Sequence, residues 1–351
     1  MRVALVNDVR MALEALRRVV LSIPGTEVAW VATDGREAVA QCFRDTPDLI
    51  LMDMIMPVMD GVEATHHIMR QCPCPNLVVT ATVTGNAGRD YEALGHGALD
   101  AVNTPAIGTD GDLAGADNLV RKIRTLERLT GPAPDAAPTA ITATPTGTSG
   151  ATSLVSPMVV IGASTGGPQA LVQVISALPR RRPFSVVIVQ HLDALFAPGL
   201  AQWLTTETAQ PVTVIESGQP IVDGSISVAG TGDHVILDRR GRLRYVREPA
   251  DHVHRPSVDV FFHSLLAAPV RPGSAVLLTG MGRDGAAGLK ALREAGWETI
   301  AQDRATSVIW GMPGAAVNLD AADHVLPVDA IGGQIGARHT TTPHTNVRMD
   351  P

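Results

Sequence analysis

The chain is poor in cysteine and aromatic residues and has no long apolar run. Of its 351 residues, three are cysteines and only 3% are aromatic. Three cysteines do not make the disulfide framework of a small secreted domain, and no apolar stretch approaches the roughly 20 residues that a membrane span requires. The first ten residues, MRVALVNDVR, read as a short strand followed by a charge rather than a signal peptide. These absences predict a cytoplasmic protein without direct membrane insertion.

An excess of positive charge is also missing. The formal net charge is −7 and there is no long basic run, which argues against a nucleic-acid partner. Three arginines do cluster at residues 180–182, but they follow a helical pattern, where cations interact favourably with a helix C-terminus. We therefore expect no nucleic-acid partner.

A polar, nearly uncharged segment divides the chain. Residues 130–155 are mostly Pro, Ala, Thr, Gly and Ser, a composition that cannot bury enough apolar surface to fold. We expect a flexible linker there, between one domain over residues 1–129 and a second over residues 156–336. Residues 337–351, rich in Thr, His and Pro, are expected to form a disordered tail.

The first domain alternates short apolar runs with amphipathic helical patterns. Strands are expected at five places: Val3–Val6, Glu27–Val31, Leu49–Met52, Leu77–Thr80 and Ala98–Val102. Helices are expected near residues 10–21, 35–44, 61–70, 86–95 and 117–129. This alternation predicts an α/β fold, with a doubly wound parallel sheet that carries helices on both faces.

Three apolar runs of the second domain end in residues suited to nucleophilic catalysis. The run Met158–Ile161 enters the turn GASTGG, which places Ser164 at a sharp strand-to-helix turn. The run SVVIVQH ends in His191, and SAVLLTGMGRDG breaks into glycines around Asp284. Since ligands collect at the carboxyl ends of parallel strands, these side chains are expected to form a Ser-His-Asp triad. The glycine-rich turn by itself is also common in parallel α/β sheets.

Two carboxylates follow strands of the first domain. Asp8 and Asp53 come after predicted strands, where neighbouring carboxylates can hold Mg²⁺ and offer an oxygen to a phosphoryl donor. Acidic residues at such turns also cap helices. The run MDMIMPVMDG, residues 52–61, favours the phosphoacceptor interpretation.

These motifs resemble two known families. PDLILMDMIMPVMDGVEA (47–64) resembles the phosphoacceptor segment of bacterial response-regulator receiver domains. GASTGG, QH and TGMGRDGAAGL resemble the methylesterase domain of chemotaxis-type protein-glutamate methylesterases, the CheB family. NDVRMALEAL, MDGVEATHHIMRQ and GHGALDAVNTPAIG are most similar to the branch that serves Wsp-type alternative chemosensory systems. The resemblance implies a flavodoxin-like receiver domain followed by a Rossmann-like methylesterase domain.

The receiver resemblance implies a role for several residues of the first domain. Asp53 would be the phosphoacceptor, and Asp8, Asp53 and the backbone carbonyl of Ile55 would hold Mg²⁺. Thr80 would be the switch hydroxyl, and a CheA-type histidine kinase would donate the phosphoryl group.

Three positions depart from the receiver pattern. Asn7 replaces one of two acidic residues, Ala101 replaces an aromatic residue and Thr104 replaces a lysine. A threonine cannot supply the cation that pairs with the phosphoryl charge. The strength of a phosphorylation switch in this chain is therefore left open by the sequence.

The methylesterase resemblance implies a hydrolytic mechanism. Ser164 would attack the carbonyl of a glutamate γ-methyl ester. His191 would take the proton of the serine hydroxyl and pass it to the departing methanol, and Asp284 would hold the imidazole. Backbone N–H groups near three residues would form the oxyanion hole: Thr165, Met281 and Gly282. No cofactor is implied for the esterase reaction. The implied substrates are methyl-accepting chemoreceptor-type proteins, whose selected glutamines the family also deamidates.

Several alternatives stay open at this level. The chain could be a non-catalytic, phosphorylation-controlled binding module, a DNA-binding response regulator or a general small-molecule esterase. His252 and His254, in DHVHRPSVD, would line the substrate groove or lie in a surface loop, and WGMPGAA (310–316) would shape the cleft floor or pack the backbone. If the family pattern holds, the unmodified receiver packs over the Ser164 cleft and phosphorylation weakens that contact.

Overall fold

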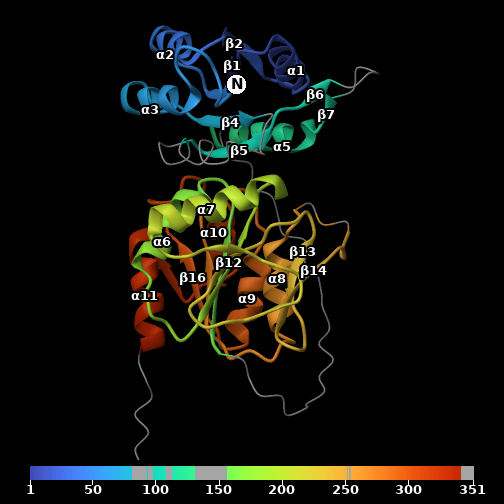
Figure 1. The fold of residues 1–351 in the computed structure, drawn as a ribbon, viewed down its shortest axis with the longest axis vertical. Helices are drawn as coiled ribbons and strands as arrows, with labels where there is room; N and C mark the ends of the chain where they lie inside the picture. Colours follow the sequence, from blue (N-terminus) through green and yellow to red (C-terminus); the bar gives the residue numbers. More distant parts are fainter. Residues whose placement is uncertain are drawn as a thin grey trace, which may run out of the picture. The chain divides into compact units, whose positions relative to one another are not determined.

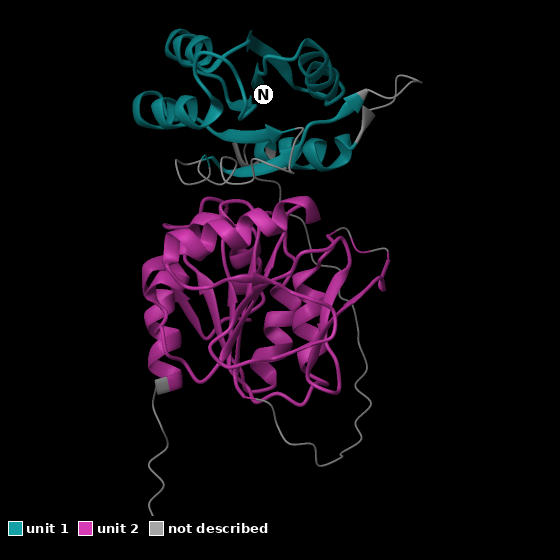
Figure 2. Ribbon diagram, viewed as in Figure 1, with its two compact units in different colours: residues 1–153 teal, residues 154–351 magenta. Residues whose placement is uncertain are grey.

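The structure, a computed structural model, describes residues 1–80, 93, 98–107, 113–130, 156–250, 252 and 254–340. The chain divides into two compact units, residues 1–153 and 154–351 (Figure 2). Each unit has its own parallel sheet flanked by helices (Figure 1), which confirms the predicted α/β class. Nearly all of the helix predicted near 86–95, and of the predicted linker, lies outside the described residues. None of the helices in the described ranges has the length and apolar character needed to cross a bilayer.

The first unit has a five-stranded parallel sheet in the order β2-β1-β3-β4-β5. Its strands are β1 (Arg2–Val6), β2 (Glu27–Ala32), β3 (Leu49–Met52), β4 (Asn76–Thr80) and β5 (Asp100–Asn103). The described helices are α1 (Arg10–Leu21), α2 (Gly35–Arg44), α3 (Gly61–Gln71) and α5 (Ala116–Thr130). The predicted strands are confirmed, with shifts of a residue or two at some ends. The antiparallel pair β6 (Ala106–Ile107) and β7 (Leu113–Ala114) was not predicted.

The starts of α2 and α3 follow from local sequence. Asp34 precedes α2 and its carboxylate accepts the N–H of Glu37, while Asp60 precedes α3 and accepts the N–H of Glu63. Such N-caps satisfy backbone donors that have no partner inside the helix. These acidic residues therefore fix where the two helices begin.

The second unit has a seven-stranded sheet in the order β10-β12-β9-β8-β15-β16-β17, and every pairing in it is parallel. Its strands are β8 (Met158–Ala163), β9 (Ser185–Gln190), β10 (Thr213–Val214), β12 (Ile226–Val228), β15 (Ser274–Leu277), β16 (Glu298–Gln302) and β17 (His324–Leu326). Its helices are α6 (Gly167–Ala177), η1 (Ala194–Phe196), α7 (Ala197–Thr208), α8 (Val258–Leu265), α9 (Ala286–Glu294), α10 (Met312–Asn318) and α11 (Val328–Thr340). A small antiparallel sheet of β11 (Gln219–Pro220), β14 (Arg242–Val246) and β13 (His234–Leu237) lies beside these elements and was not predicted.

The connections in both units reverse direction near the middle of the sheet. In the second unit, the chain moves from β8 through β9 to the edge strand β10, returns to β12, and then crosses to β15, β16 and β17 on the other side of β8. Helices α6, α7 and α11 pack together, and α8, α9 and α10 pack together (Figure 1). Right-handed crossovers in opposite directions place these two groups on opposite faces. Each sheet therefore has a topological switch point, where α/β sheets bind ligands. It lies at the carboxyl ends of β1 and β3 in the first unit and of β8 and β15 in the second.

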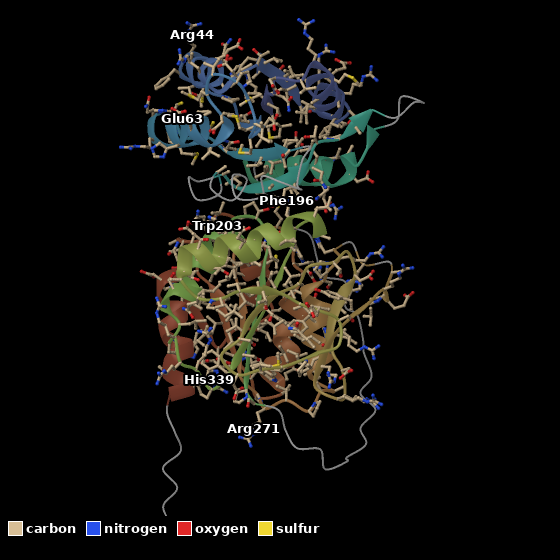
Figure 3. All side chains as sticks on the ribbon, in the orientation of Figure 1. Arg44, Glu63, Phe196, Trp203, Arg271 and His339 are labelled. Atoms are coloured by element: carbon tan, nitrogen blue, oxygen red, sulfur yellow. The ribbon has the colours of Figure 1, made fainter. Side chains whose placement is uncertain are left out.

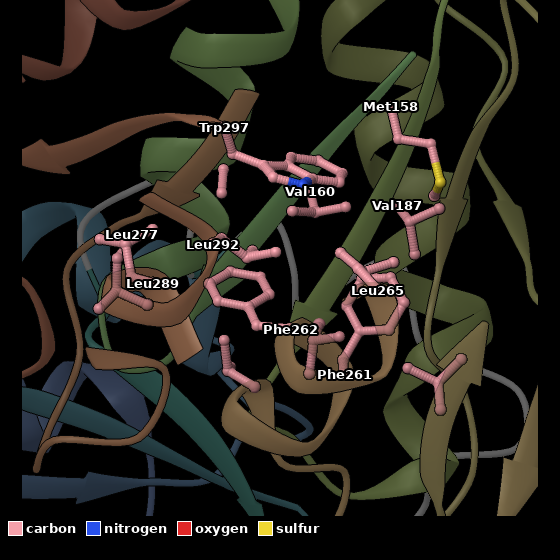
Figure 4. Close-up of a cluster of buried hydrophobic side chains, with 14 of the residues drawn as sticks. Met158, Val160, Val187, Phe261, Phe262, Leu265, Leu277, Leu289, Leu292 and Trp297 are labelled. Atoms are coloured by element: carbon pink, nitrogen blue, oxygen red, sulfur yellow. The ribbon is translucent and has the colours of Figure 1, made fainter. Parts of the chain in front are cut away.

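Helix α8 is anchored in the core of the second unit. Phe261 and Phe262 are fully buried, and Figure 4 shows them beside Leu265 and the strand residue Val187. Burying each aromatic side chain contributes about 2 kcal/mol. The apolar face of α8 therefore fixes the position of its N-terminal end.

The predicted tail begins too early, because α11 continues through residues 337–340. Glu298, at the start of β16, is 6% exposed and accepts hydrogen bonds from the Ser274 hydroxyl (2.6 Å) and the Gln334 amide (2.8 Å). His339, labelled in Figure 3, has its Nε2 3.2 Å from the Ser274 hydroxyl and its ring 4.6 Å from that of Phe184. These contacts hold the last turn of the helix against the sheet, which composition alone did not indicate.

Replacing Glu298 is expected to destabilise the second unit. In Glu298→Ala, the buried Ser274 hydroxyl and the half-buried Gln334 amide lose their acceptor, so the free energy of unfolding should fall by about 2 kcal/mol. Urea denaturation followed by tryptophan fluorescence, to which the neighbouring buried Trp297 contributes, measures this change. The matched control, Glu294→Ala at an exposed position of α9, should stay within about 0.5 kcal/mol of the parent. Equal stability of Glu298→Ala and the parent would contradict this account.

Candidate active site

Adjacent strands bring Ser164 and His191 to the same edge of the sheet. Ala163, the last residue of β8, pairs with Gln190, the last residue of β9. The N–H of His191 donates to the carbonyl of Ala163 over 2.9 Å. The predicted nucleophile and base therefore follow directly after two paired residues, and both are largely buried, at 6% and 8% exposure.

The turn after Ser164 depends on glycines. Gly166 has φ of +77°, a left-handed conformation that side chains disfavour, and α6 starts at the next residue. A Cβ on Gly280 would lie 2.7 Å from the Cβ of Ser164, so only glycine permits this approach. The N-terminus of α6, with its partial positive charge, consequently begins three residues after the serine.

His191 and Asp284 form a direct hydrogen bond. The imidazole Nε2 lies 2.7 Å from Oδ2 of Asp284. Because an ionised carboxylate only accepts, Nε2 carries the proton and Nδ1 keeps its lone pair. Nδ1 is buried and has no hydrogen-bond partner among the described residues. The nitrogen that can act as a base is thus Nδ1, and its bond to the Ser164 hydroxyl is not formed in this structure, as is common before substrate binds.

The carboxylate of Asp284 lies at the N-terminus of α8. It accepts the N–H groups of Val258 (2.7 Å) and Asp259 (3.0 Å) and the hydroxyl of Ser257 (2.8 Å). Burial alone would raise the pKa of Asp284, but the hydrogen bond and charge of His191, together with the backbone donors, hold it below its ordinary value. Asp284 is therefore an anion at neutral pH and can stabilise a protonated His191.

The two histidines of DHVHRPSVD lie beside other histidines. The ring of His254 stacks on that of His191, with centroids 4.2 Å apart and an interplanar angle of 6°. The ring of His252 meets that of His234 edge-on at 5.6 Å. Of the two alternatives left open by the sequence, the structure places His254 at the site rather than in a remote surface loop.

The glycine-rich turn after β15 lies beside Ser164. Met281 and Gly282 follow Gly280 in this turn, and among the described residues neither of their N–H groups donates to a backbone carbonyl. The N–H of Met312 donates to the carbonyl of Gly280 over 2.9 Å, and a Cβ on Gly311 would lie 2.6 Å from the same oxygen. The segment WGMPGAA therefore packs its backbone against this turn. Thr165, the third predicted oxyanion residue, is 1% exposed beside Ser164.

In the first unit, Asp53 lies at the end of β3 with Asp8 close by. Its N–H donates to the carbonyl of Val6 (2.9 Å), and its Oδ1 accepts the N–H of Met54 (2.8 Å). Partial burial, with a further contribution from the negative charge of Asp8, raises the pKa of Asp53 to about 6. Two predicted metal ligands are thus brought together, and Thr80 lies buried at the end of the neighbouring strand.

The other predicted receiver residues are also at this edge. The side chain of Ile55, two residues after Asp53, is 39% exposed. Asn7 uses its side-chain oxygen to accept the N–H of Val9 (2.8 Å). The N–H of Thr104 donates to the carbonyl of Thr80 (2.9 Å), and its hydroxyl is buried without a partner among the described residues. No group of three His, Cys, Asp or Glu side chains able to hold a metal occurs in the described part of the chain.

Sequence reasoning missed one residue that contacts the site, Ser257. A signal for it exists, because serine before the helical pattern VDVFFHSL is a typical N-cap. That its hydroxyl also reaches Asp284, 27 positions away in the sequence, is a tertiary contact that no local pattern indicates.

The fold and site define a two-unit α/β protein, with a receiver-like acidic edge in one unit and serine, histidine and aspartate at one sheet edge in the other. Residues 159–335 match the family described as CheB methylesterase, and residues 3–108 match the response regulator receiver domain. A protein-glutamate methylesterase/protein-glutamine glutaminase of Mesorhizobium japonicum is 50% identical over 95% of this chain and 98% of that protein. One from Pseudomonas aeruginosa is 46% identical over the same shares.

A solved structure supports the same assignment. The catalytic domain of Thermotoga maritima CheB methylesterase matches 53% of this chain and 100% of that domain, with 32% identity and a TM-score of 0.50. The chain belongs to the CheB family of protein-glutamate methylesterases/protein-glutamine glutaminases, and it is an enzyme with an N-terminal receiver domain. The finer placement in a Wsp-type branch stays a prediction.

Removing the charge of Asp53 is expected to stabilise the first unit. The pKa of Asp53 is about 6 in the folded protein, above the ordinary 3.8. The folded state therefore becomes less stable as pH rises from 3.8 to about 6, because the carboxyl group ionises more readily in the unfolded chain. Asp53→Asn should therefore gain roughly 2 kcal/mol at pH 7.5 without divalent cations, and the gain should vanish at about pH 3, below the ordinary pKa of the carboxyl group. Urea denaturation at both pH values measures it. The control Asp48→Asn, at an exposed site, should show no such pH-dependent gain, and a constant gain for Asp53→Asn would contradict the assignment.

Proposed function

We propose that this protein hydrolyses glutamate γ-methyl esters, and deamidates selected glutamines, on chemoreceptor signalling domains through an acyl-enzyme on Ser164. The observation that carries this proposal is the hydrogen bond between His191 and Asp284, which leaves a buried, unpaired Nδ1 beside the strand end that bears Ser164. The names of the relatives supply the substrate class.

The reaction begins with attack of the Ser164 hydroxyl on the ester carbonyl. As the oxygen–carbon bond forms, the hydroxyl proton passes to Nδ1 of His191, and the carboxylate of Asp284 stabilises the resulting imidazolium. The negative oxygen of the tetrahedral intermediate is stabilised by backbone N–H groups near Met281 and Gly282, and near Thr165.

Collapse of this intermediate breaks the bond to the leaving group. His191 returns its proton to the departing methoxide, so methanol leaves, or to the departing amide nitrogen, so ammonia leaves. Water then attacks the acyl-enzyme with His191 as base, and the products are free Ser164 and a glutamate carboxylate.

In the receiver unit we propose that Asp53 accepts a phosphoryl group from a CheA-type histidine kinase. Asp8 and Asp53, with the carbonyl of Ile55, would hold Mg²⁺. Burial, with a smaller contribution from the negative charge of Asp8, raises the pKa of Asp53, and a cation at this site would offset the cost of ionising the carboxylate. Mg²⁺, when bound, neutralises the charge of the incoming phosphoryl group. Thr80 would offer its hydroxyl to that group, while Thr104 supplies no cation.

Regulation follows from the joining of these two units. We expect the unmodified receiver unit to restrain the esterase and phosphorylation at Asp53 to relieve this restraint. A change from 1% to 99% active molecules would take roughly 5.5 kcal/mol of differential stabilisation, so smaller graded control is compatible with a receiver that lacks the lysine.

Ser164→Ala is expected to abolish hydrolysis, because no other described group at this edge replaces the nucleophile. Methanol release from a methyl-labelled chemoreceptor signalling fragment should fall by about 10³-fold or more. The control Ser217→Ala, at an exposed loop position, should match the parent. Methanol release by Ser164→Ala at the parental rate would contradict the role of Ser164 as the nucleophile. No methanol release by the parent would favour the non-catalytic binding module instead.

Removal of the receiver unit is expected to raise the basal rate. A fragment of residues 156–351 should release methanol faster than the unmodified full-length chain, and a small phosphoryl donor with Mg²⁺ should stimulate only the full-length protein. Full-length Asp53→Asn should not respond to the donor. A fragment no faster than the unmodified chain would rule out restraint by the receiver.

A further inference from the structure

A buried histidine that the mechanism does not use lies close behind Asp284. His234, the first residue of β13, is 0% exposed. Its Nδ1 accepts the N–H of Ser257 (3.1 Å), and its Nε2 donates to the carbonyl of Pro249 (3.0 Å). Since Nδ1 accepts from a backbone amide, the ring is the neutral tautomer with its proton on Nε2. Burial lowers the pKa of His234, which keeps the ring in this form.

His234 therefore ties together the two ends of the segment 249–257. The far end, Ser257, is the N-cap of α8, and its hydroxyl accepts the N–H of Val260 (3.3 Å) while it donates to Asp284 (2.8 Å). A continuous line of hydrogen bonds thus runs from His234 through Ser257 and Asp284 to His191. The same segment carries His254, whose ring stacks on His191.

We propose that His234 is a positioning residue for the esterase reaction, which sets the orientation of the Asp284 carboxylate towards His191 by fixing Ser257. This inference rests on the proposed hydrolysis by Ser164. If Ser257 is not held in place, the carboxylate of Asp284 can tilt: it still caps α8 but no longer faces Nε2 of His191. The expected effect is therefore a lower kcat. If His234 only stabilised the fold, replacing it would change the free energy of unfolding but would leave the acid limb of the kcat/KM profile in place.

Two variants of similar size separate the two hydrogen bonds of His234. In His234→Asn, the side-chain oxygen can occupy the place of Nδ1 and accept from Ser257. In His234→Gln, the amide nitrogen can occupy the place of Nε2 and donate to Pro249, while the acceptor for Ser257 is lost. Both are made in the full-length chain and assayed for methanol release from the methyl-labelled chemoreceptor fragment. His324→Gln, at the first residue of β17, is the control, because the amino end of this strand lies away from the strand ends that carry Ser164 and His191.

His234→Gln is expected to lower kcat by about 10- to 100-fold, with KM within about twofold of the parent. The acid limb of its kcat/KM profile should move to lower pH, because a poorly oriented Asp284 stabilises the His191 imidazolium less. His234→Asn, which keeps an acceptor for the N–H of Ser257, should have a kcat within about threefold of the parent and an acid limb at the parental position. His324→Gln should leave both unchanged.

The outcomes are distinguishable from failure of the proposed function. If Ser164→Ala retains activity in the same assay, the hydrolysis itself is misassigned. If Ser164→Ala is inactive, two outcomes overturn the positioning role. In the first, His234→Gln has the parental kcat and acid limb. In the second, the Asn and Gln variants of His234 lose activity equally and the acid limb does not move. If His234→Gln does not fold, Ser257→Ala decides. It keeps the backbone N–H that donates to His234 but removes the hydroxyl, with its bonds to Asp284 and to the N–H of Val260. Loss of kcat with the acid shift supports the role, and parental kinetics overturn it.

Discussion

The buried negative charge of Asp284 is the constraint around which the catalytic unit is organised. A carboxylate at this depth loses several kcal/mol of hydration unless protein donors replace water. Here the donors are the imidazole of His191, the hydroxyl of Ser257 and two backbone N–H groups at the start of α8. Because Phe261 and Phe262 anchor α8 in the core, the apolar packing of the unit determines where the charge and its imidazole partner lie.

The two units place different chemistry at the same kind of position. In each sheet the connections reverse between two neighbouring strands, β1 and β3 in the first unit and β8 and β15 in the second. The carboxyl ends of these pairs lead to Asp8 and Asp53 in one unit and to Ser164 and Asp284 in the other. At such a point the flanking helices lie on opposite faces of the sheet and leave the strand ends uncovered. Parallel topology thus accounts for the location of both sites, and the side chains account for the difference in their chemistry.

Much of the fold was predictable because its signals are local. Strands such as β8 and β9 are buried along their whole length, so they appear in the sequence as short continuous apolar runs bounded by turns. The antiparallel strand β14 is only partly buried and mixes polar with apolar residues, and β13 is a run of four residues that starts with a histidine, so neither stood out. The end of α11 was misjudged for a related reason, since its last turn is held by Glu298 and Phe184, which lie far away in the sequence.

Local patterns are enough to show which residues follow the strands, because Ser164, His191 and Asp284 each come after a recognisable apolar run. Their mutual arrangement depends on the packed fold: which imidazole nitrogen faces Asp284, the stacking of His254 on His191, and the hydrogen bonds that join His234, Ser257 and Asp284. These contacts join residues that are far apart in the sequence. His191 and Asp284 are 93 positions apart, and an orientation set by donors from separate elements exists only once the sheet and α8 have packed.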